Sequence, residues 1–275
     1  PFYAEMGGQM GDSGYIESAE GKFEIIDTKK ENNLSVHLAT KMPSDPTASF
    51  HAYVNTDKRQ NTACNHTATH ILDYALRTVL GSHVEQKGSL VSSEMLRFDF
   101  SHFQKVTPEE LRQVEKLANK MVRENIAREE ARDMPIDEAR AMGAIALFGE
   151  KYGDKVRVVK YGPSVELCGG THVKSTGMIG MIKILSESSV AAGVRRIEAV
   201  SGEAAENYIN AAFDEVNSLK EFFAGTPNLL NSVKKSIEEN ASLKKEVEKY
   251  MLECIQVIKD KMIEQATTLG DYKLV

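Results

Sequence analysis

The sequence predicts an α+β protein with three consecutive parts, on the basis of three observations. Short β-prone runs separated by glycine and proline occupy the first 60 residues. The middle of the chain combines helical and strand-like spacings of apolar residues, whereas beyond Gly202 the spacing is helical almost throughout. With 275 residues, the chain is long enough to form two or three separate cores.

The composition is that of an ordinary globular protein, with 41% hydrophobic and 27% charged residues. No run reaches the roughly 18 apolar residues of a membrane-spanning helix, so we expect no membrane partner. Three scattered cysteines are too few for a disulfide framework and favour a cytoplasmic location. The net charge of −6 argues against broad, non-specific nucleic-acid binding. Because the chain opens on Pro1, we expect it to be part of a longer protein.

The first part is expected to contain two strands, over residues 22–27 and 34–40, with prolines after them. The second part then opens with a helix, because apolar residues recur at helical spacing from Asn65 until Gly81 ends the pattern. Alternating residues predict a strand around Met95–Phe100.

A long amphipathic helix is expected next, over residues 107–132. It opens with Thr107, which can cap it, and a proline suited to the first helical position. Four more strands are expected over 155–162, 164–170, 177–190 and 193–202.

The third part, residues 203–267, is expected to be a helical, coiled-coil-like arm with a break at 225–228. In its second helix one stripe suits a partner helix. This stripe consists of Leu230, Val233, Ile237, Asn240, Leu243, Val247, Met251, Cys254 and Ile258. We therefore expect the chain to be able to form a homodimer through the arm. Residues 268–275 are interpreted as the start of a truncated C-terminal domain.

Two histidine-bearing segments carry the strongest functional signal. In the stretch ELCGGTHV, Cys168 precedes His172 by four positions. In the stretch NHTATH, His66 and His70 are one helical turn apart and can converge on one ion. Three imidazoles and one thiolate match the tetrahedral nitrogen and sulfur sphere that Zn²⁺ prefers.

The simpler reading of each pair alone is a small buried thiol or a hydrogen-bonded polar residue, but the two pairs together favour a metal site. Cys64 would point away from His66 on a helix. The remaining histidines show no ligand spacing: His37, His51, His83 and His102. Gly169 and Gly170 allow a tight turn and leave the ion open to a substrate.

The helix lacks the glutamate of the HExxH proteases, which argues against that chemistry. The metal could be structural, could position a substrate or could polarise water, and four protein ligands favour the first two unless one ligand dissociates. A second signal is the loop EMGGQMGDSG, where Gly7 and Gly8 allow a ligand to approach and Gln9 could hold a water molecule or an ester carbonyl. Taken alone, this segment is simply a turn-rich loop.

Six ordered motifs carry a family resemblance: FYAEMGGQMGDSG, NHTATH, LRFDFSHF, ELCGGTHV, TGMIG and RRIEAVSG. Together they resemble the editing domain of alanyl-tRNA synthetase and its free-standing deacylase relatives. The helices after residue 202 resemble the linker to that family's C-terminal dimerisation domain. The resemblance implies a partial small β-barrel over residues 1–60 and a zinc-containing α+β editing domain over 61–202.

The resemblance also implies hydrolysis of tRNA(Ala) mischarged with serine or glycine, with the tRNA acceptor end as the partner. Such editing is needed because an alanine pocket rejects a substrate that differs by one small group by only about 1–3 kcal/mol. Zinc is placed on His66, His70, Cys168 and His172, and the catalytic loop on Gly7, Gly8 and Gln9. Substrate contacts are expected from Gly169, Gly170, Thr171, Arg195 and Arg196, with Lys174 and Lys183 as further candidates for phosphate contacts. The aminoacylation and ATP-binding part of the parent ligase is absent, so no charging of tRNA is expected.

Two alternatives remain. The editing domain of threonyl-tRNA synthetase shares the two-pair zinc arrangement, and a non-catalytic tRNA-binding or dimerising module would use zinc only to stabilise its fold. One residue departs from the family pattern: Met6 stands where the family has serine.

Overall fold

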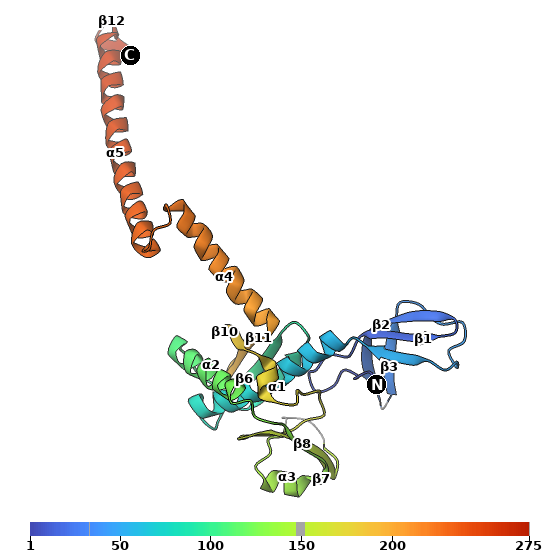
Figure 1. Ribbon diagram of the computed structural model, residues 1–275. Helices are drawn as coiled ribbons and strands as arrows, with labels where there is room; N and C mark the ends of the chain where they lie inside the picture. The colour runs from blue at the N-terminus through green and yellow to red at the C-terminus, as the bar shows by residue number, and fades with distance from the viewer. Residues whose placement is uncertain (33, 147–151, 275) are drawn as a thin grey trace. The chain divides into compact units, whose positions relative to one another are not determined.

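The computed structural model describes residues 1–32, 34–146 and 152–274. It divides into two compact units, Pro1–Ile209 and Asn210–Val275, and each is described here by itself. Strands and helices are interleaved through the first unit, whereas the second is mainly helical (Figure 1). The mixed α+β class expected from the sequence is confirmed.

The N-terminal sheet is antiparallel, with the strand order β3-β2-β1-β4. Its strands are β1 (Gly14–Ser18), β2 (Gly21–Glu31), β3 (Leu34–Ala39) and β4 (His51–Val54). Both expected strands are therefore confirmed, as β2 and β3. Phe23 and Ile25 of β2 are buried while the residues between and beside them are exposed, so one face of the strand forms the local core. Closure of this sheet into a barrel stays a prediction, because β3 and β4 lie at its two ends.

Helix α1 (Thr56–Leu80) begins earlier than the sequence pattern indicated. The Asn55 side chain accepts a hydrogen bond from the Lys58 backbone N–H and caps the first turn. The first turns are largely exposed and polar, so apolar spacing could not reveal them. Farther along, an unbroken run from Thr62 to Asp73 is buried on every side of the helix. The predicted end at Gly81 is confirmed.

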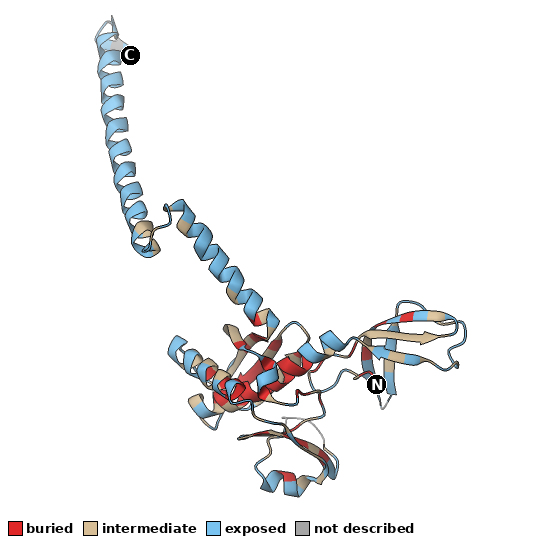
Figure 2. Cartoon of the chain, viewed as in Figure 1, coloured by how far each residue is buried: buried red, intermediate tan, exposed pale blue. Residues whose placement is uncertain are grey.

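The central sheet has the order β10-β11-β6-β5 and is antiparallel throughout. Its strands are β5 (Gln86–Val91), β6 (Leu96–Ser101), β10 (Ile182–Ala191) and β11 (Val194–Ser201). Helices α1 and α2 (Pro108–Arg123) pack against it and against each other. Buried residues concentrate on α1 and this sheet (Figure 2). The strand expected over 177–190 starts only at Ile182, because Thr176–Ile179 forms a 3₁₀ turn.

The helix expected over residues 107–132 was wrong in its second half. It ends at Arg123, and Asn125 takes a left-handed φ of 49°. Residues Glu129–Pro135 form β7 instead, because their backbone groups pair with β8 (Lys155–Tyr161). The hydrogen bonds and packing of this strand pairing thus outweigh the local helix propensity of the charged side chains.

Strand β8 also pairs with β9 (Ser164–Leu167), giving a three-stranded sheet in the order β7-β8-β9. Helix α3 (Ile136–Ala141) covers it over a small core of Ala139, Val156, Val158 and Leu167. The chain leaves β9 directly into residues 168–172, so this sheet sets the position of the loop.

In the arm, α4 is Glu203–Phe222 and α5 is Leu229–Glu264, with the expected break between them. A short hairpin of β12 (Thr267–Leu269) and β13 (Tyr272–Leu274) follows. No residue of α5 is buried, and the expected apolar stripe lies uncovered. Among the described residues, no helix is both long enough and apolar enough to cross a membrane.

Replacing Thr107 with alanine is expected to destabilise the first unit by about 1 kcal/mol, because α2 loses its capping box. Thr107 Oγ1 accepts from the Glu110 N–H at 3.2 Å, and the Glu110 carboxylate accepts from the Thr107 N–H at 2.8 Å. Urea unfolding should show a lower midpoint with an unchanged slope. Thr40→Ala, at an exposed threonine, is the matched control and should change stability by less than about 0.5 kcal/mol. Equal midpoints for the two variants would refute the capping role.

Candidate metal centre

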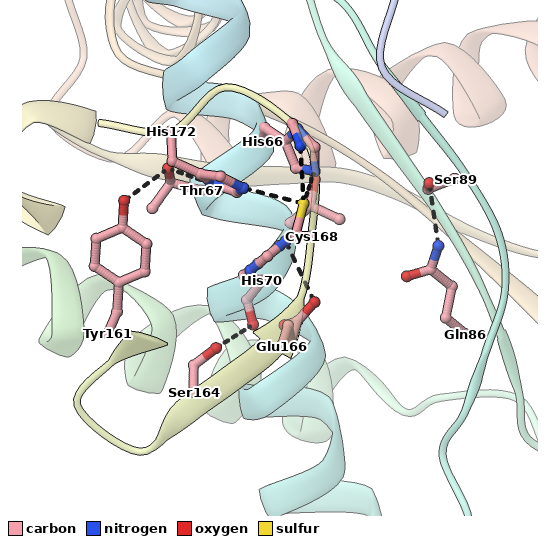
Figure 3. A network of polar contacts seen from close by, with 12 residues as sticks. His66, Thr67, His70, Gln86, Ser89, Tyr161, Ser164, Glu166, Cys168 and His172 are labelled. Carbon is pink, nitrogen blue, oxygen red and sulfur yellow. Dashed lines mark hydrogen bonds and ion pairs between the residues drawn. The ribbon is translucent and has the colours of Figure 1, made fainter. Parts of the chain in front are cut away.

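Four potential metal ligands from two distant segments meet at one point in the first unit. His66 and His70 lie on α1, and Cys168 and His172 lie on the loop after β9. Their ligand atoms all lie within 4.8 Å of one another. Cys168 Sγ is 3.3 Å from His66 Nε2 and 3.2 Å from His172 Nε2. The three rings gather around the sulfur (Figure 3), and the group could hold a metal ion.

Burial keeps the three imidazoles uncharged. Burial first, and then the positive charge of Arg157, lowers the pKa of His66 to about 3. Burial and the neighbouring His66 hold the pKa values of His70 and His172 well below the ordinary value. A neutral imidazole offers the lone pair that a metal needs, so the three histidines are in their ligating form at neutral pH.

Gln9 connects the two ligand pairs and is fully buried. Its amide oxygen accepts from the Thr171 backbone N–H at 2.8 Å, and since that group can only donate, the orientation of the amide is fixed. The same oxygen lies 2.7 Å from His66 Nδ1. His66 therefore carries its proton on Nδ1 and leaves Nε2 free on the side of Cys168. Gln9 Nε2 in turn donates to Thr171 Oγ1 at 2.9 Å.

Thr67 supports the other end of the cluster from α1. Its Oγ1 lies 3.1 Å from His172 Nδ1 and accepts from the Val173 N–H at 3.2 Å. The hydroxyl of Tyr161, on β8, donates to the Val173 carbonyl. The His172 ring is therefore oriented from α1, and the backbone of the next residue is held from α1 and β8.

A buried carboxyl group lies beside His70, with Glu166 Oε2 at 3.3 Å from His70 Nε2. Burial, and then the nearby Asp73 carboxylate, raises the pKa of Glu166 well above its ordinary value. Burial also raises the pKa of Asp73 to about 6. Both shifts favour the neutral carboxyl form, which matches the uncharged ring of His70.

Two arginines hold the loop after β9 by its carbonyl groups. Arg157 of β8 donates to the carbonyls of Cys168 at 2.8 Å and Gly170 at 2.7 Å. Arg128, just before β7, donates to the carbonyl of His172 at 2.9 Å. Because these hydrogen bonds are made to backbone carbonyls, they fix the loop and leave the ligand atoms of Cys168 and His172 free to bind a metal.

Glu130 of β7 partly balances these charges. Its carboxylate accepts from Arg157 Nε at 3.0 Å and lies 3.3 Å from a terminal nitrogen of Arg128. Hydrogen bonds from Arg157 and Arg132 lower the pKa of Glu130 to about 2. The carboxylate therefore stays charged at every pH at which the protein is expected to work.

The glycines of the N-terminal loop place Gln9. Met6 and Gln9 exchange two backbone hydrogen bonds, of 3.2 and 3.1 Å, around Gly7 and Gly8. The φ angles of Gly7 and Gly8 are 59° and 83°, which favour glycine. The Gly8 carbonyl accepts from the Val91 N–H of β5 at 2.8 Å, which anchors the turn.

The loop after β9, residues 168–172, is called the metal loop below. It forms one wall of a cavity of about 660 Å³. Gly169, Gly170, Thr171 and His172 all contribute to this wall. The cavity gives one side of the cluster access to a ligand, as the two glycines led us to expect.

Arg195 and Arg196 lie elsewhere, on β11. Arg196 makes a two-point ion pair with Asp99, at 2.6 and 2.8 Å, and Arg195 Nε donates to Glu187 at 2.5 Å. The structure does not bring either arginine into the wall of the cavity. Their expected contact with substrate remains a prediction.

Sequence reasoning missed the charged residues of β7, β8 and the residues just before β7. The missed set is Arg128, Glu130, Arg132, Lys155 and Arg157. Arg128, Glu130 and Arg132 stand at every second position and share one face of an extended segment, although Glu129 and Asp133 are charged as well. Reading that stretch as a helix obscured the alternation.

Replacing Gln9 with leucine is expected to weaken Zn²⁺ binding about 10- to 100-fold, as for other residues that orient a metal ligand. The variant leaves His66 Nδ1 and the Thr171 N–H without their acceptor. Gln9→Glu keeps an acceptor oxygen and should recover much of the affinity. Competition with a chelator measures both variants, with circular dichroism as the control for folding. Wild-type affinity in Gln9→Leu would contradict the orienting role.

Comparisons with known proteins agree with the motifs. Residues 156–198 match the family model described as threonyl and alanyl tRNA synthetase second additional domain, and residues 1–59 match that of class II (A) tRNA synthetases. The alanine–tRNA ligase of Parabacteroides distasonis is 57% identical over 275 residues, covering 100% of this chain and 32% of that protein. The alanine–tRNA ligase of Porphyromonas gingivalis is 58% identical over 266 residues, covering 96% of this chain and 30% of the relative. The alanine–tRNA ligase of Bacteroides thetaiotaomicron is 55% identical over 275 residues, covering 100% of this chain and 32% of that protein.

The matched segments include two of the four candidate ligands and Gln9, whereas His66 and His70 lie between the two segments. The second additional domain model covers the loop that carries Cys168 and His172, and the class II model covers the loop that carries Gln9. The chain spans about a third of the length of the relatives it matches. The resemblance drawn from the sequence motifs is confirmed: this chain is homologous to the alanyl-tRNA synthetases along its whole length.

Proposed function

We propose that this chain is an editing module of an alanyl-tRNA synthetase, which hydrolyses the ester of Ser-tRNA(Ala) and Gly-tRNA(Ala). The observation that supports this most is the metal cluster beside an accessible cavity whose wall includes its ligand His172, in a chain homologous to alanine–tRNA ligases. Four protein ligands fill the tetrahedral sphere of Zn²⁺, so the proposed role of the ion is to position a substrate beside the cavity and not to activate a bound water. The proposal includes no aminoacylation by this chain.

Zn²⁺ is the proposed ion, because three neutral imidazoles and a thiolate are its usual donors. Zn–N bonds of about 2.0 Å and a Zn–S bond of about 2.3 Å at the tetrahedral angle separate nitrogen and sulfur by about 3.5 Å. The two distances from Cys168 Sγ to His66 Nε2 and His172 Nε2, 3.3 and 3.2 Å, are close to this value. The donor set therefore fits the ion.

When bound, Zn²⁺ supplies a positive charge that can orient the terminal ribose or the amino acid of the substrate. Gly169 and Gly170 present only backbone to the cavity, which leaves space for the ester. Thr171 Oγ1 accepts from Gln9, so the Thr171 hydroxyl keeps its own proton to donate to water or to the ester carbonyl.

Gln9 contributes through position. Gly7 and Gly8 set its place, and its Nε2 donates to Thr171 Oγ1, which lies in the cavity wall and can hold the attacking water. Attack of this water on the ester carbonyl releases serine or glycine and leaves the ribose hydroxyl of the tRNA.

Hydrolysis assays with Ser-tRNA(Ala), Gly-tRNA(Ala) and Ser-tRNA(Thr) test the proposal. Release of serine or glycine from tRNA(Ala), abolished by a chelator and restored by Zn²⁺, is the expected result. Faster hydrolysis of Ser-tRNA(Thr) would favour a threonyl-type editing domain. This alternative is included because the matched family model describes a domain of both threonyl and alanyl tRNA synthetases. Binding of tRNA(Ala) with no hydrolysis of any substrate would favour a non-catalytic module with structural zinc.

We further propose that the arm self-associates and that the protein works in the cytoplasm, where mischarged tRNA arises. The uncovered apolar residues of α5, such as Leu243 and Val247, support a helical partner. Sedimentation at increasing concentration should show a dimer that Leu243→Lys with Val247→Lys dissociates. A monomer at every concentration would contradict self-association.

A further inference from the structure

The cavity beside the metal loop is strongly basic, although the chain as a whole carries a net charge of −6. Five cationic side chains line it, against two carboxylates, Glu130 and Asp133. The cations are Arg59, Arg128, Arg132, Lys155 and Arg157. A local excess of positive charge on an acidic protein marks a place for an anionic ligand.

The charges do not balance within the protein. Glu130 alone faces three guanidinium groups, since it accepts from Arg157 at 3.0 Å and from Arg132 at 2.6 Å and lies 3.3 Å from Arg128. The Lys155 side chain makes no hydrogen bond or ion pair within the described part of the chain, although its backbone pairs with β7. Arg59 is satisfied separately, by Asp12.

The five cations divide by role. Arg128 and Arg157 hold backbone carbonyls of the metal loop, so their main task is structural. Arg132 and Lys155 are exposed and hold no part of that loop. These two side chains are therefore the ones available to a ligand that enters the cavity.

We propose that Arg132 and Lys155 bind backbone phosphates of a single RNA strand whose 3′-terminal ester lies at the metal centre. This inference rests on the proposed function and names the subsite that orders the strand. Guanidinium and ammonium groups suit phosphate oxygens, and such contacts position a strand without reading its sequence. Because Gly169–His172 wall the same cavity, a strand held there leads directly to the ligands.

The test compares two double variants of equal charge. Arg132→Ala with Lys155→Ala removes the subsite, and Arg112→Ala with Lys120→Ala removes one arginine and one lysine from the exposed surface of α2. The probe is a labelled short RNA with the 3′-terminal sequence of tRNA(Ala), titrated at several salt concentrations. The cavity variant should bind about tenfold more weakly, with a salt slope lower by about 0.7 for each lost contact, and the α2 variant should match wild type. Equal affinity and slope for the cavity variant and wild type would overturn the proposal.

Two further experiments distinguish failure of the phosphate subsite from failure of the proposed editing function. Inorganic phosphate at the same concentration of phosphate groups should not displace the RNA, and displacement would make a free anion the occupant and overturn the proposal. The cavity variant should also lose about tenfold more kcat/KM on Ser-tRNA(Ala) than on seryl-adenosine, which has no phosphate, and equal losses would count against the subsite. If wild type hydrolyses neither ester, the editing function fails, and the RNA titration still decides the phosphate subsite.

Discussion

Replacing Cys168 with alanine should abolish stoichiometric zinc binding, with a loss of affinity of at least about 100-fold. The sulfur lies within 3.3 Å of two ligand nitrogens, and no other cysteine belongs to the cluster among the described residues. Loss of a ligand should exceed the 10- to 100-fold effect expected for a residue that only orients one. Metal analysis after dialysis measures the content, and chelator competition measures the affinity.

Cys254→Ala is the matched control, because Cys254 is exposed on α5 and lies in the other unit. It should keep about one zinc per chain. Because zinc stabilises only the folded state, removing it should lower the melting temperature of wild type and of this control. The same chelator should leave the melting temperature of Cys168→Ala unchanged. Full zinc content in Cys168→Ala would remove Cys168 from the ligand set.

Replacing Gly170 with alanine should disrupt the metal centre almost as strongly, although alanine adds a single methyl group. The new Cβ would lie 2.1 Å from His66 Cε1, 2.4 Å from His66 Nδ1 and 2.8 Å from Gln9 Oε1. His66 and Gln9 are buried and hydrogen-bonded to each other, so neither can move without breaking the ligand arrangement. Overpacking typically costs about 1–3 kcal/mol, and we expect zinc affinity to fall at least about tenfold.

The neighbouring glycine supplies the control. A Cβ at Gly169 would approach only the end of the Met6 side chain, at 2.9 Å, and that flexible chain can move aside. Gly169→Ala should therefore keep zinc affinity within about threefold of wild type. Equal losses of zinc affinity in the two variants would show that the loop can rearrange around an added methyl group. That result would contradict the claim that close packing of Gly170 on His66 holds the ligands in place.

The spacing of the ligands was readable from the sequence, but the loop geometry was not. His66 and His70 share a helix face, and Cys168 and His172 share one short loop, so each pair is a local pattern. That the pairs meet depends on packing α1 against the β9 segment, which brings together residues about a hundred positions apart. Ligand chemistry predicted that contact in advance, because the two pairs complete one tetrahedral set, and the motif resemblance implied it as well.

The errors in the fold came from polar segments whose structure depends on distant partners. Apolar spacing missed the start of α1, where an asparagine cap and an exposed first turn set the boundary. Helix propensity extended α2 through Glu130, which pairs with β8, and through Arg128, whose backbone N–H donates to the Lys174 carbonyl. The same error concealed the role of Arg128, which holds the His172 carbonyl only because this segment is extended.

Zinc K-edge X-ray absorption of the purified protein tests the central claim most directly, namely that α1 and the loop after β9 hold one ion between them. The predicted spectrum contains one sulfur at about 2.3 Å and three imidazole nitrogens at about 2.0 Å. In Cys168→Ala the sulfur contribution should disappear together with most of the metal. A wild-type spectrum that contains only nitrogen and oxygen ligands would contradict the account.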